Sequence, residues 1–510
     1  MTAHVEVRRG MYRDSIALMQ ASRDLAALDG VAAAFIAMGT DLNLDLLVSM
    51  GFDRPVGVGP NDMVVAITAS DEAGLSRAMD ALDHVLAPPG AANATRARGS
   101  SPSPPPPARL TANALDRANL AMVSVPGMHA FVEAVDALEG GLSVMIFSDN
   151  MPLDQEVWLK AEAAGRGLLV MGPDCGTAIV AGAGLGFANV VRPGPVGVVA
   201  ASGSGAQQLM CLLDAAGVGV SHCLGVGGRD LSADVGGLST RRALELLDDD
   251  PATDLIVVLS KPPDTSVAAA VRAHVQQLGK PVLFGWPGGR SGGGPAESPL
   301  LDAQPEPDAY RDPSTYPDLT ALAVGVLAAL GHPPPVWPRW MPADPLPRRS
   351  GALRGLYSGG TLSDEALGIA AARLGKIAVD DLEALGHLVV DFGDDRFTAG
   401  RAHPMIDPTL RSEQLHRDLA NPATGVVVVD VVLGHGAHPS PAAPIADIVR
   451  AAVETGDIVP PVVAALIGTA TDPQSLETQA GLLVEAGVRV FLSHAEAVGA
   501  ALDLLIGEVP

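Results

Sequence analysis

The sequence has few aromatic residues, few lysines, three cysteines and no long apolar run. Aromatic residues make up 3% of the chain although 48% of it is hydrophobic, so the core must be built mainly from Ala, Val and Leu, which suits parallel sheets covered by helices. No apolar run approaches the roughly 18 residues that a membrane span needs, and the N-terminal MTAHVEVRRGMYRDS lacks the apolar stretch of a signal peptide. We therefore expect a cytoplasmic protein that does not insert into a membrane.

The scarcity of cysteine and lysine narrows the possible chemistry. Cys175, Cys211 and Cys223 are odd in number and lack the spacing of metal ligands, so we expect reduced thiols, no disulfide framework and no metal site. Arginine supplies most of the positive charge, so a substrate anion should be bound by Arg or by backbone N–H groups. The net charge of -25 argues against a nucleic-acid partner, because such binding needs clustered Lys and Arg. The lysines are Lys160, Lys261, Lys280 and Lys376.

The most informative feature that is present is an internal repeat. Residues 251–260 read PATDLIVVLS, and residues 422–431 read PATGVVVVDV. Each is preceded by a short apolar strand that runs into small residues, GVVAASGSG at 197–205 and GLYSGGT at 355–361. Because order and chemistry agree, we expect two copies of one open α/β unit, each of roughly 150 residues. Each copy also has a Gly/Asp turn, at Gly227-Gly228-Arg229-Asp230 and at Gly393-Asp394-Asp395-Arg396.

The length of 510 residues predicts several domains. The N-terminal part has the pattern of a small α/β or α+β domain, and two Pro-rich stretches read as linkers, the first of which cannot bury enough apolar surface to fold. The remaining segments alternate strand and helix, as in the βαβ units of a parallel sheet. The expected divisions are 1–88 (N-terminal domain), 89–111 (disordered linker), 112–193 (Rossmann-like domain), 194–333 (first copy), 334–349 (linker) and 350–510 (second copy).

The turn Ser202-Gly203-Ser204-Gly205 joins an apolar strand to a helix-like stretch. Its glycines let a ligand approach the backbone, and the free N–H groups and dipole of a helix N-terminus attract anions, so the turn is a candidate phosphate site. It has neither the Gly-Lys-Ser/Thr of a P-loop nor the third glycine of a dinucleotide fingerprint, and a simple N-cap is an alternative explanation. The second copy carries the equivalent Gly359-Gly360-Thr361, which favours the functional interpretation.

Another helix start is expected in the second copy at Gly434-His435-Gly436, after the strand VVVVDVVL. The histidines of this turn are suited to metal binding or proton transfer near pH 7, or they are exposed loop residues; no further ligands with metal-site spacing accompany them. We predict that the Ser202–Gly205 turn and the Gly434–His438 turn begin two helices whose N-termini point at one shared cavity.

The richest polar segment is Gly393–Pro408, which follows the apolar strand HLVVDF. Arg401 can place its planar guanidinium on a carboxylate or a phosphate. Asp394, Asp395 or His403 can serve as a general acid or base. The alternative is that the aspartates and arginines of this loop bind one another for structural reasons.

Several segments resemble the alpha subunit of succinyl-CoA synthetase, namely VSVPG (123–127), MGPDCG (171–176), VGVVAASGSGAQ and LGVGGRD (224–230). The second copy, from GLYSGGT to VVLGHGAHPS, is similar to the C-terminal domain of the synthetase's beta subunit. Over its whole length the chain resembles the FdrA family, through GPDCGTAI, GVGGRDLS, SKPP, DFGDD and GRAHPMIDPTLR. The resemblance implies a CoA-binding-like Rossmann domain followed by two flavodoxin-like synthetase domains.

The resemblance also implies functional residues and an activity. The loop Pro173-Asp174-Cys175-Gly176 would lie in the active centre, and the glycine-rich helix starts would hold the phosphate of an acyl phosphate. Arg229 and Arg401 would bind a substrate carboxylate or developing negative charge, and His403 would assist proton transfer. FdrA-type proteins are linked to allantoin catabolism as a subunit of oxamate carbamoyltransferase, which moves a carbamoyl group between oxamate and phosphate.

The sequence departs from the synthetase pattern in ways that limit the activity. No histidine stands in Phe284–Gly293, where the synthetase has its phosphorylated histidine, and no glutamate stands near Ser260–Pro263 to orient one. The ATP-grasp domain is absent, and residues 1–88 replace the first loop that cradles CoA. A phosphohistidine relay therefore cannot run in this chain alone. We expect no required cofactor and weak binding of CoA at most.

Three functions are compatible with the sequence. The leading hypothesis is a carbamoyl- or acyl-phosphate-handling transferase subunit that acts on a small acyl phosphate and a carboxylate substrate. The second is an acyl-CoA synthetase whose nucleotide site lies on a partner subunit. The third is a non-catalytic scaffold that holds a metabolite and recruits catalytic subunits. We expect further protein subunits and an oligomer.

Overall fold

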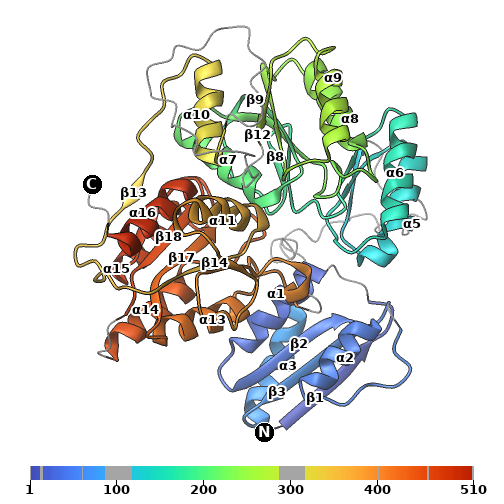
Figure 1. The fold of residues 1–510 in the computed structure, drawn as a ribbon. Coiled ribbons are helices and arrows are strands. Elements are labelled where there is room, and N and C mark those ends of the chain that lie inside the picture. The colour runs from blue at the N-terminus through green and yellow to red at the C-terminus, as the bar shows by residue number, and fades with distance from the viewer. Residues whose placement is uncertain are drawn as a thin grey trace, which may run out of the picture. The chain divides into compact units, whose positions relative to one another are not determined.

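The computed structural model describes residues 2–11, 15–59, 61–86, 118–285, 316–398, 401–455 and 459–507 (Figure 1). The chain forms two compact units, the first of Met1–Ala114 with Ala399–Ala402 and the second of Leu115–Thr398 with His403–Pro510. The expected linker 89–111 and most of the Phe284–Gly293 segment lie outside the described residues. None of the helices in the described part of the chain is both long and apolar enough to cross a membrane.

The first unit is a three-stranded antiparallel sheet with helices on both faces, as expected for a small α+β domain. The sheet order is β1-β3-β2, so β3 lies in the centre and is buried along most of its length. Because side chains alternate along a strand, Met63, Val65 and Ile67 pack with α1 and α3, whereas Val64 and Ala66 pack with α2. The elements are β1 (Thr2–Arg8), α1 (Ser15–Ala26), β2 (Val31–Met38), α2 (Asp41–Ser49), β3 (Met63–Ala69) and α3 (Glu72–Val85).

The second unit begins with a small parallel sheet of order β4-β5-β6. Apolar residues on one face of this sheet pack with the two helices α5 and α6. Met145 and Met171, on its other face, join the core of the neighbouring larger sheet. The short strands are therefore covered on both faces, as parallel strands require. The elements are β4 (Leu120–Val123), α5 (Gly127–Glu139), β5 (Ser143–Ile146), α6 (Leu153–Gly165) and β6 (Val170–Met171).

The first copy of the repeat is a six-stranded sheet of order β12-β11-β9-β10-β7-β8. Strands β9 to β12 are parallel, β7 pairs antiparallel with β10, and the edge strand β8 pairs antiparallel with β7. Polar residues begin its helices, because Ser202 caps α7, Asp264 caps α9 and Asp318 caps α10. The elements are β7 (Thr177–Val180), β8 (Ala183–Gly186), β9 (Pro193–Ala200), α7 (Gly203–Ala215), β10 (Val220–Gly225), α8 (Leu238–Asp249), β11 (Leu255–Leu259), α9 (Thr265–Val275), β12 (Val282–Gly285) and α10 (Leu319–Ala329).

The second copy is a seven-stranded sheet of order β13-β19-β18-β17-β14-β16-β15. All its strand pairs are parallel except that of the edge strand β13 with β19. The elements are β13 (Arg339–Trp340), β14 (Ala352–Tyr357), α11 (Gly360–Leu374), β15 (Ala378–Val379), β16 (Leu388–Asp391), α12 (Asp395–Thr398), α13 (Thr409–Ala420), β17 (Thr424–Val432), α14 (Ala443–Glu454), β18 (Val462–Ile467), α15 (Leu476–Glu485), β19 (Arg489–Phe491) and α16 (His494–Ile506).

The strand orders confirm the α/β fold class and the repeat. The order β12-β11-β9-β10 of the first copy matches β18-β17-β14-β16 of the second, and the two PAT segments lead into the equivalent strands β11 and β17. Two expected boundaries differ from the structure. Strands β7 and β8 lie before residue 194 but belong to the first copy's sheet, because β7 pairs with β10. The expected linker 334–349 contains β13 and the buried Trp337, because β13 extends the edge of the second sheet.

Four helices join the two copies. Helix α7 packs on α10 and α11 on α16, while α7 also meets α11 and α10 meets α16 (Figure 1). In the repeat, α7 is equivalent to α11 and α10 is equivalent to α16, so the contact of α7 with α10 corresponds to the contact of α11 with α16. Gln208 and Glu365, each the sixth residue of its helix, reach the other copy at or just before the start of its last helix. Gln208 Nε2 donates to Leu492 O (3.1 Å), and Glu365 Oε2 accepts from Leu319 N (2.6 Å).

The first turns of α7 and α11 come into direct contact. Ser202 Oγ and Thr361 Oγ1 are 2.6 Å apart and share a hydrogen bond. The counterpart of this pair under the repeat is Gly359 with Ser204, and a Cβ atom at Gly359 would lie only 2.4 Å from Ser204 Oγ. Glycine is therefore required at 359 by space and not by backbone conformation, because its φ of −142° suits any residue.

Replacing Gly359 by Ala should force α7 and α11 apart and destabilise the second unit by about 1–3 kcal/mol, as overpacking does. The double variant Gly359→Ala/Ser204→Gly should recover most of the loss, because it removes the atoms that the new methyl group meets. Urea denaturation midpoints of the wild type and the variants measure the effect. Equal midpoints for Gly359→Ala and the wild type would show that the two helix starts are not in tight contact in solution.

Candidate functional site

The paired starts of α7 and α11 create a region of positive potential. Each helix N-terminus carries about half a positive charge on its free N–H groups. At the other end of the helix layer, the Glu365 carboxylate neutralises the equivalent pair: it accepts from Leu319 N at the start of α10 and pairs with His494 Nδ1 (2.6 Å) at the start of α16. At α7 and α11, no carboxylate of the described residues accepts a hydrogen bond from the first-turn N–H groups. This pair is therefore arranged to receive an external anion.

Lys261 adds a full positive charge to this region. It follows β11, and its Nζ would lie 3.2 Å from a Cβ atom at Gly360, the first residue of α11. Its Nζ forms an ion pair with Asp364 Oδ2 (3.1 Å). Burial alone would lower the pKa of Lys261, but the neighbouring carboxylates of Asp364, Asp391 and Asp394 outweigh it and raise the pKa above its ordinary value. The ammonium is therefore charged at neutral pH.

Asp391 ends β16 beside the same helix start. Its Oδ1 accepts from Gly393 N (2.9 Å), and its Oδ2 would lie 2.7 Å from a Cβ atom at Gly360. Burial raises the pKa of Asp391 from 3.8 to about 7; Asp430 and Asp380 add to the rise, while the Gly393 hydrogen bond and Lys261 oppose it. A carboxyl group with this pKa can exchange a proton near neutral pH.

The loop Pro173-Asp174-Cys175-Gly176 is held close to the sheets. Asp174 adopts a left-handed conformation (φ 58°), and its N donates to Ser148 O while Cys175 N donates to Ile146 O. Burial of the carboxyl group among protein atoms and the charges of Asp149 and Asp395 raise the pKa of Asp174 to about 7, although the residue as a whole is exposed to solvent. Cys175 points into the core, and burial raises the pKa of its thiol, so it is a packing residue and not a nucleophile.

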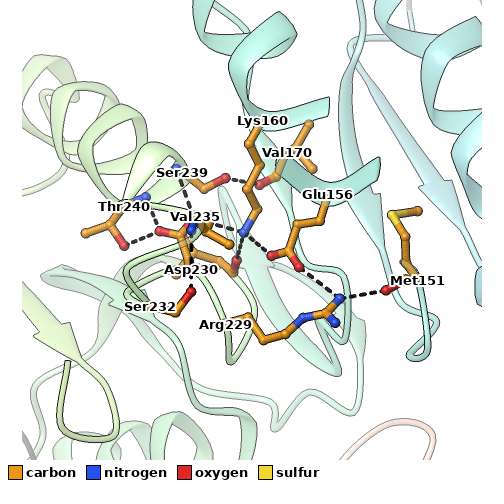
Figure 2. A network of polar contacts seen from close by, with 11 residues as sticks. Met151, Glu156, Lys160, Val170, Arg229, Asp230, Ser232, Val235, Ser239 and Thr240 are labelled. Atoms are coloured by element: carbon orange, nitrogen blue, oxygen red, sulfur yellow. Dashed lines mark hydrogen bonds and ion pairs between the residues drawn. The ribbon is translucent and has the colours of Figure 1, made fainter. Parts of the chain in front are cut away.

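Arg229 belongs to a buried ion-pair network (Figure 2). Its Nη2 donates to Met151 O (2.8 Å) and lies 2.9 Å from Glu156 Oε2. Its side chain remains 46% exposed, so the other side of the guanidinium is open to a ligand. The predicted role for Arg229 in substrate binding therefore requires that it keep the Glu156 contact and use its remaining N–H groups.

Lys160 is the centre of the same network. Its three N–H groups donate to Glu156 Oε1 (2.8 Å) and Asp230 Oδ1 (2.8 Å), which Figure 2 shows, and to Val226 O (2.9 Å). The side chains of Lys160 and Asp230 are fully buried. Asp230 also accepts from Thr240 at the start of α8. The network thus connects α6 of the small sheet to the Gly/Asp turn of the first copy.

His403 lies close to the loop after Asp391, because its Nε2 would be 3.0 Å from a Cβ atom at Gly393. Its Nδ1 accepts from Met405 N (3.2 Å), so in the neutral ring the proton is on Nε2. Burial and the charge of Arg411 lower the pKa of His403 to about 4, and the ring packs against Phe187 (5.6 Å between centroids). The histidine is therefore neutral at pH 7 and is suited to donate a hydrogen bond from Nε2.

The Gly434-His435-Gly436 turn does not begin a helix, so that prediction is wrong. Helix α14 starts only at Ala443, after Pro439 and Pro441 and with Pro444 as its second residue, and the helix that meets α7 is α11. Gly434 and Gly436 instead pack against Gly186–Asn189, where His435 N donates to Ala188 O (2.8 Å). Asn189 in turn contacts Gln207 on the first turns of α7 (3.2 Å).

The polar segment after β16 is held together largely by its own charges. Arg396 forms ion pairs with Asp394 (3.1 Å) and with Asp380 (3.1 Å). These contacts agree with the alternative that charged residues of this loop bind one another for structural reasons. Arg401 is exposed, groups with the first unit and forms no ion pair with another described residue. Its role as a substrate clamp therefore stays a prediction.

Sequence reasoning missed Lys261, Asp391 and Asp430. Asp430 is fully buried in β17; it accepts from Ser358 N and Oγ (2.9 Å each), and Arg411 Nη1 pairs with it (2.5 Å). In the first copy, Ala201 N at the equivalent position donates to Leu259 O (2.8 Å). An aspartate within the apolar strand VVVVDVVL and a rare lysine directly after an equivalent strand were the available signals.

Two family models match parts of the chain. One, described as "AllF, heavy metal-associated domain", matches residues 1–102, and one described as "CoA-ligase" matches residues 356–504. The first name implies a metal, but residues 1–102 contain no cysteine, and the described residues include no group of three or more His, Cys, Asp or Glu that could hold a metal ion. The side chains of the described part of this domain therefore do not fit a heavy metal.

Known proteins resemble either almost the whole chain or about a third of it. YahF of Escherichia coli (strain K12) is 35% identical over 512 residues, which cover 96% of each chain. The alpha subunit of ADP-forming succinate–CoA ligase of Methanothermobacter thermautotrophicus is 28% identical over 168 residues, or 32% of this chain and 56% of that protein. Alpha subunit 2 of the Archaeoglobus fulgidus ligase is 27% identical over 172 residues, or 32% of this chain and 58% of that protein. The scaffold is thus of the CoA-ligase type, and the chain matches just over half of each ligase subunit's length.

Among solved structures, the dinucleotide-forming acetyl-coenzyme A synthetase 1 of Ca. Korarchaeum cryptofilum, in complex with phosphate and ADP, aligns with 79% of this chain and 88% of its own. The sequence identity is 16% and the TM-score 0.30.

Replacing Lys160 by Met should leave the carboxylates of Glu156 and Asp230 buried without their cation and destabilise the second unit by about 3–5 kcal/mol. The matched control is Lys376→Met, which alters an exposed lysine and should change stability by no more than about 0.5 kcal/mol. Urea denaturation midpoints measure both. A Lys160→Met midpoint equal to that of the control would mean that the network is solvated.

Proposed function

The chain belongs to the family of YahF from Escherichia coli, and we propose that its second unit binds the phosphate of an acyl phosphate and transfers the acyl group to an acceptor. The observation that carries the proposal is the meeting of the α7 and α11 starts, with the Ser202–Thr361 contact at their centre and Lys261 beside them. The CoA-ligase scaffold supports it, because ligases of this type handle acyl groups.

The arrangement suits the chemistry of acyl phosphates. When a nucleophile attacks the acyl carbon, the bond to the phosphate oxygen breaks and negative charge accumulates on the departing phosphate. Helix N–H groups and the Lys261 ammonium are fixed donors that stabilise this charge without rearranging, and one such donor is worth about 3–4 kcal/mol in other enzymes. The hydroxyls of Ser204 and Thr361 lie in the same first turns and add further donors.

The first candidate acceptor is CoA, as in the acid–thiol ligases. The sequence has no histidine for a phosphohistidine relay in Phe284–Gly293, and a lysine stands at 261 where the relay would need a carboxylate nearby. We therefore propose that a nucleotide site and part of the CoA site are supplied by partner subunits. The protein would then work in an oligomer that contains other chains.

The second candidate acceptor is a small carboxylate amide such as oxamate, with carbamoyl phosphate as the acyl phosphate. The resemblance to FdrA proteins supports this candidate, and Lys261 favours it, because direct transfer needs a cation at the phosphate and no relay. Arg229, which keeps one side of its guanidinium open, is the proposed ligand of the acceptor carboxylate. The role of Arg401 is a separate prediction from the sequence.

Replacing Lys261 by Gln should weaken the binding of inorganic phosphate and of carbamoyl phosphate about ten- to a hundred-fold, the value of one charged hydrogen bond. Lys261→Arg should retain part of the affinity, and the control Lys376→Gln should bind as the wild type does. Isothermal calorimetry on the full chain measures the affinities. Wild-type phosphate affinity in Lys261→Gln would place the anion away from α11 and end the proposal.

Phosphate release should discriminate between the acceptors. The chain is incubated with acetyl phosphate and CoA, or with carbamoyl phosphate and oxamate, alone and with its partner proteins.

We expect the isolated chain to bind CoA more weakly than micromolar, and Arg401→Lys to lower kcat/KM with oxamate about ten- to a hundred-fold. Micromolar CoA binding by the chain alone would contradict the shared CoA site. A lower Tm for Arg401→Lys with unchanged turnover would make Arg401 a structural residue.

A further inference from the structure

We infer that Asp391 is the catalytic base that takes the proton from the acyl acceptor, and that the acceptor therefore lies on the second copy's side of the phosphate. The inference rests on the proposed acyl transfer and adds to it the proton acceptor and the class of the acceptor. The acceptor must be a nucleophile that still carries its proton when it binds, such as an amide, an amine or a thiol.

The position of the Asp391 carboxylate is set by its neighbours. The backbone N of Asp391 donates to Asp380 Oδ1 (2.8 Å), and its Oδ1 accepts from Gly393 N (2.9 Å). Its other oxygen, Oδ2, would lie 2.7 Å from a Cβ atom at Gly360, which is also the point that Lys261 Nζ approaches (3.2 Å). One carboxylate oxygen is thus fixed by the backbone, and the second is directed at the start of α11 beside the lysine.

The two copies differ at this position. Asp391 is the last residue of β16, and its counterpart at the end of β10 is Gly225. A side chain at Gly225 would collide with Cys175, whose Sγ would lie 2.5 Å from the added Cβ atom. The first copy therefore has no room for an equivalent carboxylate. At these two equivalent strand ends the second copy has a carboxylate and the first copy has none, so the otherwise repeated site is asymmetric.

A proton acceptor is what the transfer step needs here. The nucleophile H–Nu attacks the carbonyl carbon of the acyl phosphate as Asp391 takes its proton, so that the Nu–C bond forms and the C–O bond to phosphate breaks. The proton then passes from Asp391 to the released phosphate oxygen, which gives acyl–Nu and hydrogen phosphate with atoms and charge balanced. Lys261 holds the phosphate close to Asp391, so donor and acceptor of this last proton are neighbours.

The electrostatic surroundings match this role. Burial raises the pKa of Asp391 to about 7, so that the group is a stronger base than an exposed carboxylate and is still ionised just above neutral pH. The charged or polar titratable groups that face it come from several elements: Lys261 after β11, Asp380 after β15, Asp394 and Arg396 after β16, His403, and Asp430 in β17.

Two independent readouts follow for Asp391→Asn, an isosteric change that keeps an oxygen for Gly393 N. With a base of pKa about 7, the wild-type kcat/KM should fall as the pH is lowered through about 7, whereas that of the variant should be about a hundred-fold lower and lack this inflection. Stability gives the second readout. Protonated Asp391 stabilises the fold below about pH 4, and this contribution is lost as the pH rises to about 7. The Tm of the wild type should therefore fall relative to the Tm of Asp391→Asn as the pH rises over this range.

The experiment measures phosphate release by the full chain with its partner proteins, from acetyl phosphate with CoA and from carbamoyl phosphate with oxamate. Calorimetry measures the affinity for phosphate, and the Tm is measured at about pH 4.5 and 7.5. The control is Asp447→Asn, an exposed aspartate of the same copy on α14. Support is a loss of kcat/KM and of the inflection in Asp391→Asn with phosphate affinity and the control unchanged. Wild-type turnover and pH profile in Asp391→Asn, or a Tm difference that does not change with pH, overturns the assignment. Absence of phosphate binding in the wild type would instead remove the proposed function.

Discussion

The close approach of the α7 and α11 N-termini is the constraint on which the rest of the second unit depends. Two ends with like partial charges repel each other, so their contact has to be enforced by the surrounding packing. The enforcing elements are the four-helix layer, the Ser202–Thr361 hydrogen bond and the space left by Gly359. Glu365 neutralises the equivalent contact between α10 and α16, whereas Lys261 increases the positive potential at α7 and α11.

Buried ion pairs fix the elements around this point. Lys160 joins the small sheet to the turn that carries Arg229, and the Arg411–Asp430 pair holds Ser358, which directly precedes the start of α11. Replacing such pairs by apolar residues is often neutral for stability, so their presence is weak evidence of a stabilising role. The first copy achieves the corresponding junction with the Ala201–Leu259 backbone bond alone. The Arg411–Asp430 ion pair of the second copy is therefore better explained by the need to place the α11 start and Asp391 accurately.

The sequence was sufficient to predict the α/β class, the repeat and the equivalence of the Ser202–Gly205 and Gly359–Thr361 turns, because strand periodicity and glycine turns are local signals. It predicted that the Ser202–Gly205 turn faces the Gly434–His438 turn, whereas α7 meets α11. It failed for Gly434, since the distance from a strand end to the next helix depends on how a Pro-rich loop folds onto Gly186–Asn189. Lys261 and Asp391 lie in the SKPP and DFGDD segments that carry the family resemblance, but neither segment by itself marks its charged residue as part of a site. Their proximity is a product of tertiary packing, which brings the loop after β11 in one copy onto the first turn of α11 in the other.

Both copies of the repeat lie on one chain, joined through α10, β13 and the segment that leads into β14. When two halves of a site are tethered in this way, each sees the other at an effective concentration in the millimolar range whatever the dilution of the protein. A site shared between separate chains would come apart as the protein becomes scarce, whereas this one would not. The tether thereby frees the helix layer from having to provide tight intermolecular affinity, so its residues can be selected for the field that they create at the helix starts.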